Sequence, residues 1–304
     1  MARASRNIHR FWRDPAFPHL EARSIEDGQG VCYGWHSHPT FSIGLVTGGV
    51  SDFRIGAECH RIAAGTVVLM NPDEAHACNP LDSRPWSYRM LYADAAWLAA
   101  VEGETSFRAF APRLSRDPEL AGRLDRLFAV LFAPDAGPDR GSLKRAEAVR
   151  SFFTGLRQAL GGVPSAVDED GGHAALDRAA DFISAHCTQP LRLADIAEVS
   201  GLSPSYLVRS FKARYGLTPH AYQINRRIQF GRRELQRGRP IVEVALDAGF
   251  ADQAHFQRAF KRHVAATPGQ YMRPSASPPS YFSSGSEPVS ERTSAAGPCR
   301  QRPR

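Results

Sequence analysis

The chain has 304 residues, which is enough for two domains that each bury a hydrophobic core. Its net charge is +7, and its five cysteines lack CxxC spacing, as expected for reduced thiols rather than a disulfide framework. No run of about 18 apolar residues and no apolar stretch after the N-terminal arginines is present in the sequence. This excludes a membrane-spanning helix and a signal peptide, and predicts a cytoplasmic location with no membrane partner.

The first half of the chain is predicted to be rich in β-strands. From about residue 31 to residue 92, short apolar runs such as FSIGLVTGG and GTVVLMNP alternate with Gly, Pro and Asn, as in a sandwich or barrel. The order WHSHPTF, a strand, then AAGTVVLMNPDEAHACNP resembles the cupin-type ligand-binding domain of many AraC-family regulators. The residues that carry this resemblance are His36, His38, Gly65, Pro72 and His76.

Three histidines in a barrel raise the question of a metal. His36, His38 and His76, with Glu74, are residue types that bind zinc or iron. In metal-binding cupins a Glu follows the HxH pair by four or five residues, where this sequence has a serine and an isoleucine. The missing carboxylate argues against a complete metal site, so we expect no metal and no other cofactor. The histidines then either contact an organic ligand or only cap strands.

A small-molecule effector is expected in this barrel, because recognition pockets combine aromatic walls with a few polar groups. The same aromatic side chains would equally suit a plain core, and the sequence does not choose among chemical classes of effector. The predicted ligand-binding residues are Trp35, His36, His38, Phe41, Glu74, His76, Trp86 and Tyr88.

Two amphipathic segments follow the barrel, with apolar residues at helical spacing from Leu120 to Leu131 and from Leu143 to Leu160. We expect these two appended helices to bury their apolar faces against the barrel or in an antiparallel pair between the subunits of a homodimer. The stretch GGVPSAVDEDGG then predicts a linker over residues 163–173. The linker would separate a sensing and dimerisation domain, residues 1–162, from a second domain.

The second domain contains a repeated motif. GLSPSYLVRSFKARYGLTPHAY, which begins at Gly201, is followed by GFADQAHFQRAFKRHVAATPGQY from Gly249, with one residue inserted in the second turn. A helix, a tight turn with Gly and a second helix are predicted in each copy, which is the pattern of a helix-turn-helix. Residues 174–275 also hold 15 Lys and Arg against 8 Asp and Glu, as expected of a domain that contacts DNA phosphates.

At these motifs, over residues 174–274, the chain resembles the AraC/XylS family of bacterial transcription regulators. The resemblance implies an all-α domain in which a linker helix, from about His220 to Gln236, joins two helix-turn-helix units. The arginines of this helix are expected either to reach DNA phosphates or to remain solvated. They are Arg226, Arg227, Arg232 and Arg233.

The outer stripe of the second helix of each unit is expected to enter the major groove, where Arg and Gln bind guanine and adenine edges. The first unit has a serine and a valine on this stripe, so we expect the second unit to be the stronger reader. The predicted DNA-binding residues are Ser205, Val208, Arg209, Lys212, Gln253, Ala254, Gln257, Arg258 and Lys261.

Together these features predict a sequence-specific transcriptional regulator controlled by a small molecule. The family resemblance implies that it is more often an activator, that it works with RNA polymerase, and that it dimerises. The alternative is a metal-dependent cupin enzyme fused to a DNA-binding module, which the missing carboxylate disfavours, so we expect no catalytic residues. Residues 275–304, rich in Ser and Pro, are expected to be disordered.

Overall fold

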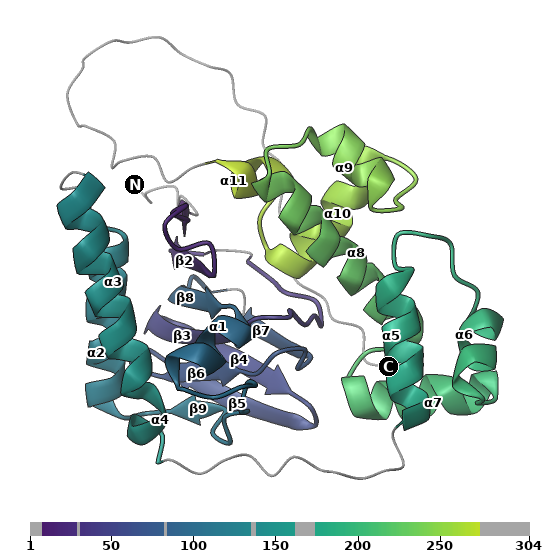
Figure 1. Ribbon diagram of the computed structural model, residues 1–304, viewed down its shortest axis with the longest axis horizontal. Helices are drawn as coiled ribbons and strands as arrows, with labels where there is room; N and C mark the ends of the chain where they lie inside the picture. The colour runs from purple at the N-terminus through teal and green to yellow at the C-terminus, as the bar shows by residue number, and fades with distance from the viewer. Residues whose placement is uncertain (1–7, 29–30, 82–83, 135–137, 162–173, 274–304) are drawn as a thin grey trace.

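A sheet-rich N-terminal domain and a helical C-terminal domain lie against each other (Figure 1). The predicted linker at 163–173 and the predicted tail at 275–304 lie outside the described residues. The computed structural model describes residues 8–28, 31–81, 84–134, 138–161 and 174–273.

The N-terminal domain contains two antiparallel sheets. Six strands pair in the order β1-β2-β8-β3-β6-β9 and three in the order β5-β4-β7. Within the described residues the sheets face each other as in a cupin-like barrel but remain two separate sheets. The strands are β1 Ile8–Trp12, β2 Leu20–Glu26, β3 Phe41–Gly48, β4 Val50–Ile55, β5 Glu58–Ala63, β6 Val67–Met70, β7 His76–Pro80, β8 Ser87–Ala93 and β9 Leu114–Ser115.

Strand β3 separates two hydrophobic cores. Successive side chains of a strand point to opposite faces, so Phe41 and Ile43 enter the core on the outer side of the larger sheet. Val46 enters the core between the two sheets, with Phe53 of β4. Because both faces are covered, β3 is buried over its first six residues instead of alternating between buried and exposed.

Helices cover the outer face of the larger sheet. In α2, Asp117 caps the N-terminus and the expected apolar face is buried, including Leu124 and Phe128. In the next helix Leu143 is not buried against the barrel and is 71% exposed in the single chain, because it is half a turn away from the buried face that holds Phe152. The helices of this domain are α1 Ala95–Val101, α2 Pro118–Leu131, α3 Pro138–Thr154 and α4 Leu156–Ala159.

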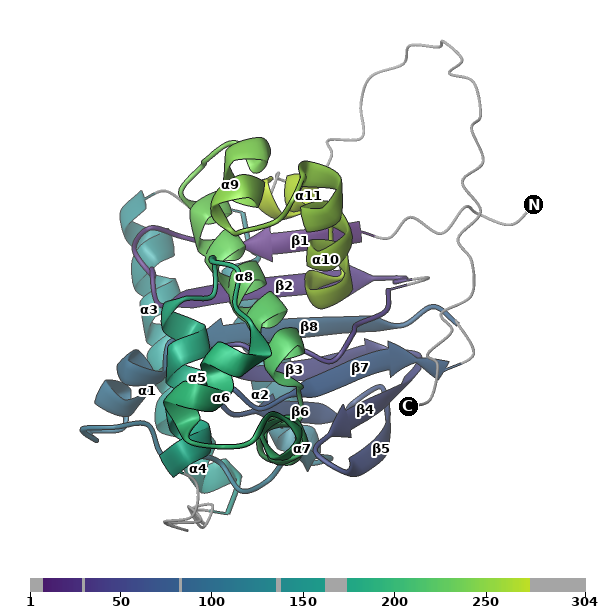
Figure 2. The ribbon, with the colours of Figure 1, turned by 90° about the vertical axis from the view of Figure 1, so that its right-hand side faces the viewer.

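The C-terminal domain is helical and contains two small cores joined by α8. One core lies among α5, α6 and α7 and the other among α9, α10 and α11, while α8 runs between the two groups and along the barrel (Figures 1 and 2). The predicted linker helix is therefore confirmed. The helices are α5 Ala174–Ala185, α6 Leu193–Ser200, α7 Pro204–Tyr215, α8 Pro219–Gln236, α9 Ile241–Asp247, α10 Gln253–Val264 and α11 Pro268–Met272. Of the helices in the described ranges, none is both long and apolar enough to cross a membrane.

Candidate functional site

The first helix-turn-helix unit consists of α6, a tight turn and α7. Helix α6 ends at Gly201, whose φ of 71° lies in the left-handed region that favours glycine. Helix α7 follows Ser203 and has Pro204 in its first turn, where a missing N–H costs nothing. Leu207 and Phe211 are one helical turn apart and fully buried, so the opposite face of α7 points outward.

The second unit repeats this arrangement with α9 and α10. Its turn contains Gly249, with a φ of 78°, and α10 is capped by Asp252, whose carboxylate accepts a hydrogen bond from the backbone N–H of His255 at 2.6 Å. Counted from its glycine to the first residue of the second helix, this turn is one residue longer than in the first unit, which agrees with the insertion predicted from the repeat. Phe256 and Phe260 are fully buried and fix which face of α10 is exposed.

Four cations on the outer faces of α7 and α10 are exposed and available to a partner. Arg209 and Lys212 lie on α7, and Arg258 and Lys261 occupy the equivalent positions on α10. Within the described residues, none of the four makes an ion pair or a side-chain hydrogen bond. Of the other predicted reading residues, Ser205 and Ala254 are exposed, and Val208, Gln253 and Gln257 are half-buried.

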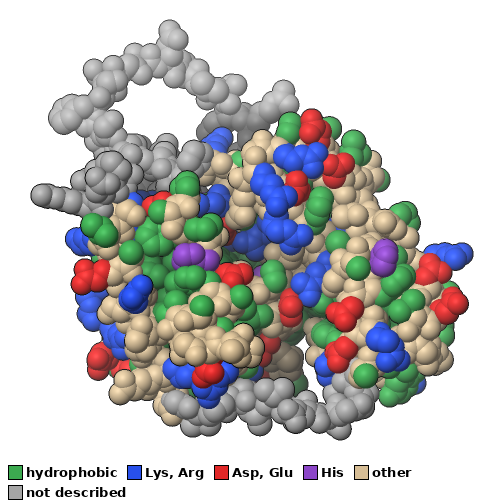
Figure 3. All heavy atoms as spheres, in the orientation of Figure 1, with side chains coloured by type: hydrophobic (Ala, Val, Ile, Leu, Met, Phe, Trp, Pro, Cys, Tyr) green, Lys and Arg blue, Asp and Glu red, His purple; other side chains and the backbone are tan. Residues whose placement is uncertain are grey.

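Three arginines of α8 are instead engaged within the protein. Arg226 forms an ion pair with Asp73 of the barrel at 3.0 Å, and Arg232 forms one with Glu21 at 2.9 Å. Arg227 donates to three backbone carbonyl groups. For these three arginines simple solvation was therefore wrong in this arrangement, because α8 lies against the barrel, whereas Arg233 is exposed as expected for a solvated side chain. Lys and Arg side chains gather over this region of α8 to α10 in the space-filling view (Figure 3).

The outward face of α7 borders a wide cleft between the two domains. Arg209 and Lys212 line this cleft on one side. The turn between β4 and β5, residues 56–57, lines it on the other side, together with Glu58 and Asp73. The face of α7 that is predicted to read bases thus lies opposite the barrel.

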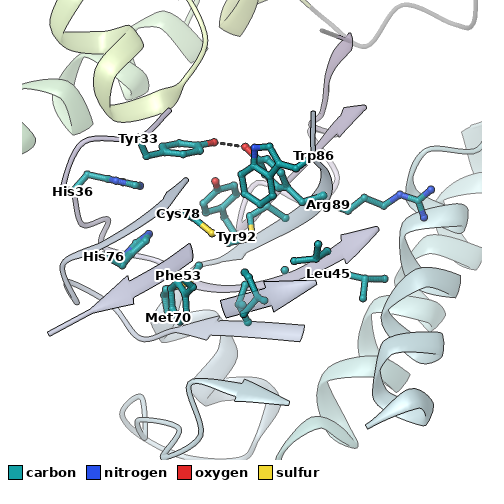
Figure 4. A pocket seen from close by; sticks show the side chains of 16 residues that line it. Tyr33, His36, Leu45, Phe53, Met70, His76, Cys78, Trp86, Arg89 and Tyr92 are labelled. Carbon is teal, nitrogen blue, oxygen red and sulfur yellow. Dashed lines mark hydrogen bonds between the residues drawn. The ribbon is translucent and has the colours of Figure 1, made fainter. Parts of the chain in front are cut away.

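A small pocket lies between the two sheets of the barrel (Figure 4). Most of its wall is aliphatic or aromatic, as is usual for small-molecule sites. Four of the predicted ligand-binding residues line it, namely His36, His76, Trp86 and Tyr88.

The other four predicted ligand-binding residues lie outside this pocket. Phe41 does not line the pocket and is buried in the core on the outer side of the larger sheet. Trp35 and Glu74 line the interdomain cleft. His38 lies behind the pocket wall. Its Nε2 is 3.1 Å from the hydroxyl of Ser42, the serine found in place of the cupin carboxylate.

The three histidines cluster, with ring centroids 4.4 Å apart for His36 and His76 and 5.0 Å apart for His38 and His76. Each Nδ1 bonds a backbone carbonyl, so in the neutral ring Nδ1 carries the proton and Nε2 is an acceptor. Burial lowers the pKa of all three, that of His76 to about 4. Within the described ranges, no group of three or more His, Cys, Asp or Glu residues is arranged to hold a metal ion.

A buried carboxylate in β2 holds the second half of the DNA-binding domain against the barrel. Glu21 accepts hydrogen bonds from Arg13 at 2.7 Å, from Arg232 at 2.9 Å, from Gln236 at 2.6 Å and from the hydroxyl of Tyr271 at 2.9 Å. Burial by itself would raise the pKa of Glu21, but the two arginines and the hydroxyl lower it to about 2.

Two residues further along β2, Arg23 connects the pocket to α10. Its side chain is almost completely buried and donates to the Tyr33 hydroxyl at 2.8 Å. It also donates to the carbonyl groups of Val264 and Ala265, at the C-terminal end of α10. The Tyr33 hydroxyl is in turn hydrogen-bonded to that of Tyr88, and both tyrosines line the pocket.

Comparison with known proteins supports both halves of this description. The model of the AraC-like ligand binding domain matches residues 19–149, and that of a helix-turn-helix domain matches residues 196–274. The regulatory protein SoxS of Salmonella typhimurium is 36% identical over 92 residues, which make up 30% of this chain and 86% of SoxS. The chain belongs to the AraC family.

This AraC-family protein is a DNA-binding transcriptional regulator with an N-terminal ligand-binding domain. Along most of its length it is similar to the uncharacterized HTH-type transcriptional regulator YbfI of Bacillus subtilis, at 26% identity over 72% of this chain and 80% of YbfI. Its fold is that of apo ToxT from Vibrio cholerae, with a TM-score of 0.55 at 14% identity over 84% of this chain and 97% of that one.

Sequence reasoning missed several residues that line the pocket of this AraC-family protein. The pocket is lined from alternate positions at and beside β8 by Trp86, Tyr88, Met90 and Tyr92. Trp86 and Tyr88 were predicted, and the strand periodicity would have added Met90 and Tyr92. Tyr33 precedes the WHSH motif outside the strands, and no pattern in the sequence identifies it.

Proposed function

We propose that an effector in the barrel pocket controls how this regulator engages DNA. The observation that carries the proposal is the position of Arg23, whose single side chain contacts Tyr33 in the pocket wall and the last carbonyl groups of α10. A ligand that changes the hydrogen bonding of Tyr33 or Tyr88 therefore changes the contacts that hold α10 to the barrel.

With α7 facing the barrel across the interdomain cleft, the first helix-turn-helix unit is restrained. Arg209 and Lys212 border the cleft opposite the barrel, so DNA bound along α7 has to enter this cleft. In a second arrangement, with the two domains separated, α7 is free to bind DNA. An effector that binds this arrangement more tightly shifts the population toward it, with a coupling free energy typically of about 1 to 3 kcal/mol. Effector binding then raises the affinity for DNA.

We assign base reading to the exposed stripes of α7 and α10. Their four cations lack partners among the described residues, whereas other arginines of this domain, such as Arg226 and Arg232, are engaged in ion pairs. Unpaired cations on helices that a helix-turn-helix presents to the major groove suit bases and phosphates. Gln253 and Gln257 lie on the same stripe of α10 and suit adenine edges.

Dimerisation, activation and contact with RNA polymerase complete the proposal. The exposed Leu143 on α3 supports a subunit contact on the helical layer, since a large apolar side chain in water favours burial. Effector control has a precedent in the fold, because one ToxT crystal structure contains a bound unsaturated fatty acid.

The test is a pair of titrations with full-length protein and an operator selected from random duplexes. DNA affinity is measured for the wild type and for Glu21→Gln with Arg226→Gln, which removes the interdomain ion pairs of Glu21 and Arg226. The double variant is expected to bind DNA more tightly in the absence of effector. Weaker or unchanged binding by a folded double variant contradicts restraint by the barrel.

A further inference from the structure

One side of the barrel pocket presents a hydrogen-bond donor that lacks an acceptor. Trp86 is 2% exposed and lines the pocket, and its indole N–H, a donor only, has no partner in the described part of the chain. Trp86 stacks on Tyr88 with ring centroids 4.3 Å apart, so the indole N–H lies on the same side as the hydrogen-bonded hydroxyls of Tyr33 and Tyr88 (Figure 4). A buried donor without an acceptor is costly, which points to a ligand oxygen at this place.

Behind these donors lies a buried positive charge without a carboxylate partner. Arg23 donates to the Tyr33 hydroxyl, to Nδ1 of His9 and to backbone carbonyl groups, and within the described residues it forms no ion pair. Its Nε is also buried without a partner. Glu21, the nearby carboxylate, is already shared by Arg13 and Arg232. Since a buried charge is unfavourable unless it is paired, this side of the pocket favours an anion.

The other side of the pocket presents acceptors. His36 and His76 lie across the pocket from Trp86 in Figure 4. Each donates its Nδ1 proton to a backbone carbonyl, of Gly34 and Glu74 respectively, at 2.8 Å in both cases, so Nε2 is left as an acceptor. No Asp or Glu lines the pocket among the described residues, and Arg89 points away from it to an ion pair with Asp125.

The space between these two sides is apolar and partly aromatic. Phe53, Ile62, Val68 and Met70 form much of this wall. A planar ring or a short hydrocarbon body fits such a wall, and the polar groups at the two sides fix its orientation.

We propose that the effector is a compact hydroxyaryl carboxylic acid. Its carboxylate accepts hydrogen bonds from the Trp86 indole and from whichever hydroxyl of the Tyr33–Tyr88 pair keeps its proton free, and its hydroxyl donates to Nε2 of His36 or His76. This inference rests on the proposed function, namely that the pocket is the effector site, and it adds the chemical class of the effector.

The test uses calorimetric titration of the full-length protein without DNA. Three acids of increasing length serve as probes: 4-hydroxybenzoate, 4-hydroxyphenylacetate and 3-(4-hydroxyphenyl)propanoate. At least one is expected to bind. Its primary amide, which removes the negative charge, and its methyl ether, which removes the hydroxyl donor, are each expected to bind roughly tenfold or more weakly. No binding of any of the three acids at roughly 10 mM, or an amide that binds as tightly as its acid, overturns the proposal.

Two variants locate the carboxylate. Trp86→Phe keeps the ring and removes the indole N–H, and is expected to weaken binding of the acid roughly tenfold while changing binding of the amide less. Trp12→Phe is the matched control, because Trp12 is buried in the other core of the barrel and does not line the pocket. Equal losses in the two variants, or equal losses for acid and amide in Trp86→Phe, overturn the assignment of the carboxylate to Trp86.

Titration of operator DNA with and without the bound acid separates this inference from the proposed function. If the acid binds and DNA affinity stays constant, the ligand class stands and control by the effector is wrong. If none of the acids binds and a neutral compound seated in the pocket changes DNA affinity, control by an effector stands and the ligand class is wrong.

Discussion

The guanidinium of Arg23 donates a hydrogen bond to the backbone carbonyl of Val264, 241 positions later in the chain. Val264 is the last residue of α10, where unpaired carbonyl groups carry partial negative charge and favour a cation. A strand of the sensor barrel therefore caps the second reading helix. Because Arg23 also bonds Tyr33, the cap and the pocket share one side chain.

Arg23→Met is expected to lower the free energy of unfolding by about 2 to 4 kcal/mol, because the carbonyl groups at the end of α10 and the Tyr33 hydroxyl lose a buried donor. Urea denaturation followed by circular dichroism measures the change. Arg192→Met is the control, since the Arg192 side chain is 84% exposed and its loss should change the free energy of unfolding much less. Equal effects of the two substitutions would contradict the role of Arg23.

The carboxylate of Glu21 predicts a loss of stability in acid. Its pKa falls from 4.5 to about 2 on folding, so its contribution is fully present above pH 4.5 and is lost as the pH falls toward 2. The shift corresponds to about 3 kcal/mol. Free energies of unfolding of the wild type and of Glu21→Gln should differ most near pH 6 and converge as the pH approaches 2. A difference that does not vary with pH would rule out this linkage.

Loss of both reading arginines tests the assignment of the DNA surface. Arg209→Ala with Arg258→Ala is expected to reduce discrimination between operator and random DNA by about 1 to 3 kcal/mol for each base that an arginine no longer reads. Arg192→Ala with Arg237→Ala removes the same charge from exposed positions off the reading stripes, and should leave discrimination unchanged. Retained discrimination in the first double variant would show that other residues read the bases.

The chain has three lysines, Lys144, Lys212 and Lys261, and comparing their substitutions tests phosphate contact. Lys212→Ala and Lys261→Ala are each expected to reduce the slope of log affinity against log salt concentration by about 1, with little change in sequence preference. Lys144→Ala, on α3 of the sensor domain, should leave the slope unchanged. Fluorescence anisotropy at several salt concentrations gives all three slopes, and equal slopes in the three variants would exclude phosphate contact by Lys212 and Lys261.

The two turn glycines are expected to differ in their tolerance of a methyl group. A Cβ at Gly249 would lie 2.2 Å from the carbonyl oxygen of Thr188, whereas nothing lies within 4 Å of one at Gly201. Both have positive φ, so Gly201→Ala is expected to destabilise by about 1 kcal/mol and Gly249→Ala by roughly 3 kcal/mol or more. Thermal unfolding compares them, and an equal loss in the two variants would mean that the contact with Thr188 relaxes at no cost.

The helical repeat was predictable because its signals are local. Gly201 ends a helix, Pro204 begins the next, and Phe256 with Phe260 marks a buried face within one turn, so neighbouring residues determine each feature. The pocket was only half predictable. The strand period identifies which side chains share a face, and it places Phe41 away from Val46, yet it does not say which face encloses a space.

By itself the sequence determined the two-domain plan, the position and spacing of the two helix-turn-helix units, and which stripe of each second helix carries Arg and Lys. The tertiary structure alone decided the rest. Only in the folded chain do arginines of α8 form ion pairs with the barrel and does the indole N–H of Trp86 lie buried without an acceptor. Only there does Arg23 donate to the last carbonyl group of α10. Burial and pairing of polar groups depend on partners that are distant along the chain, and no local pattern of residues records those partners.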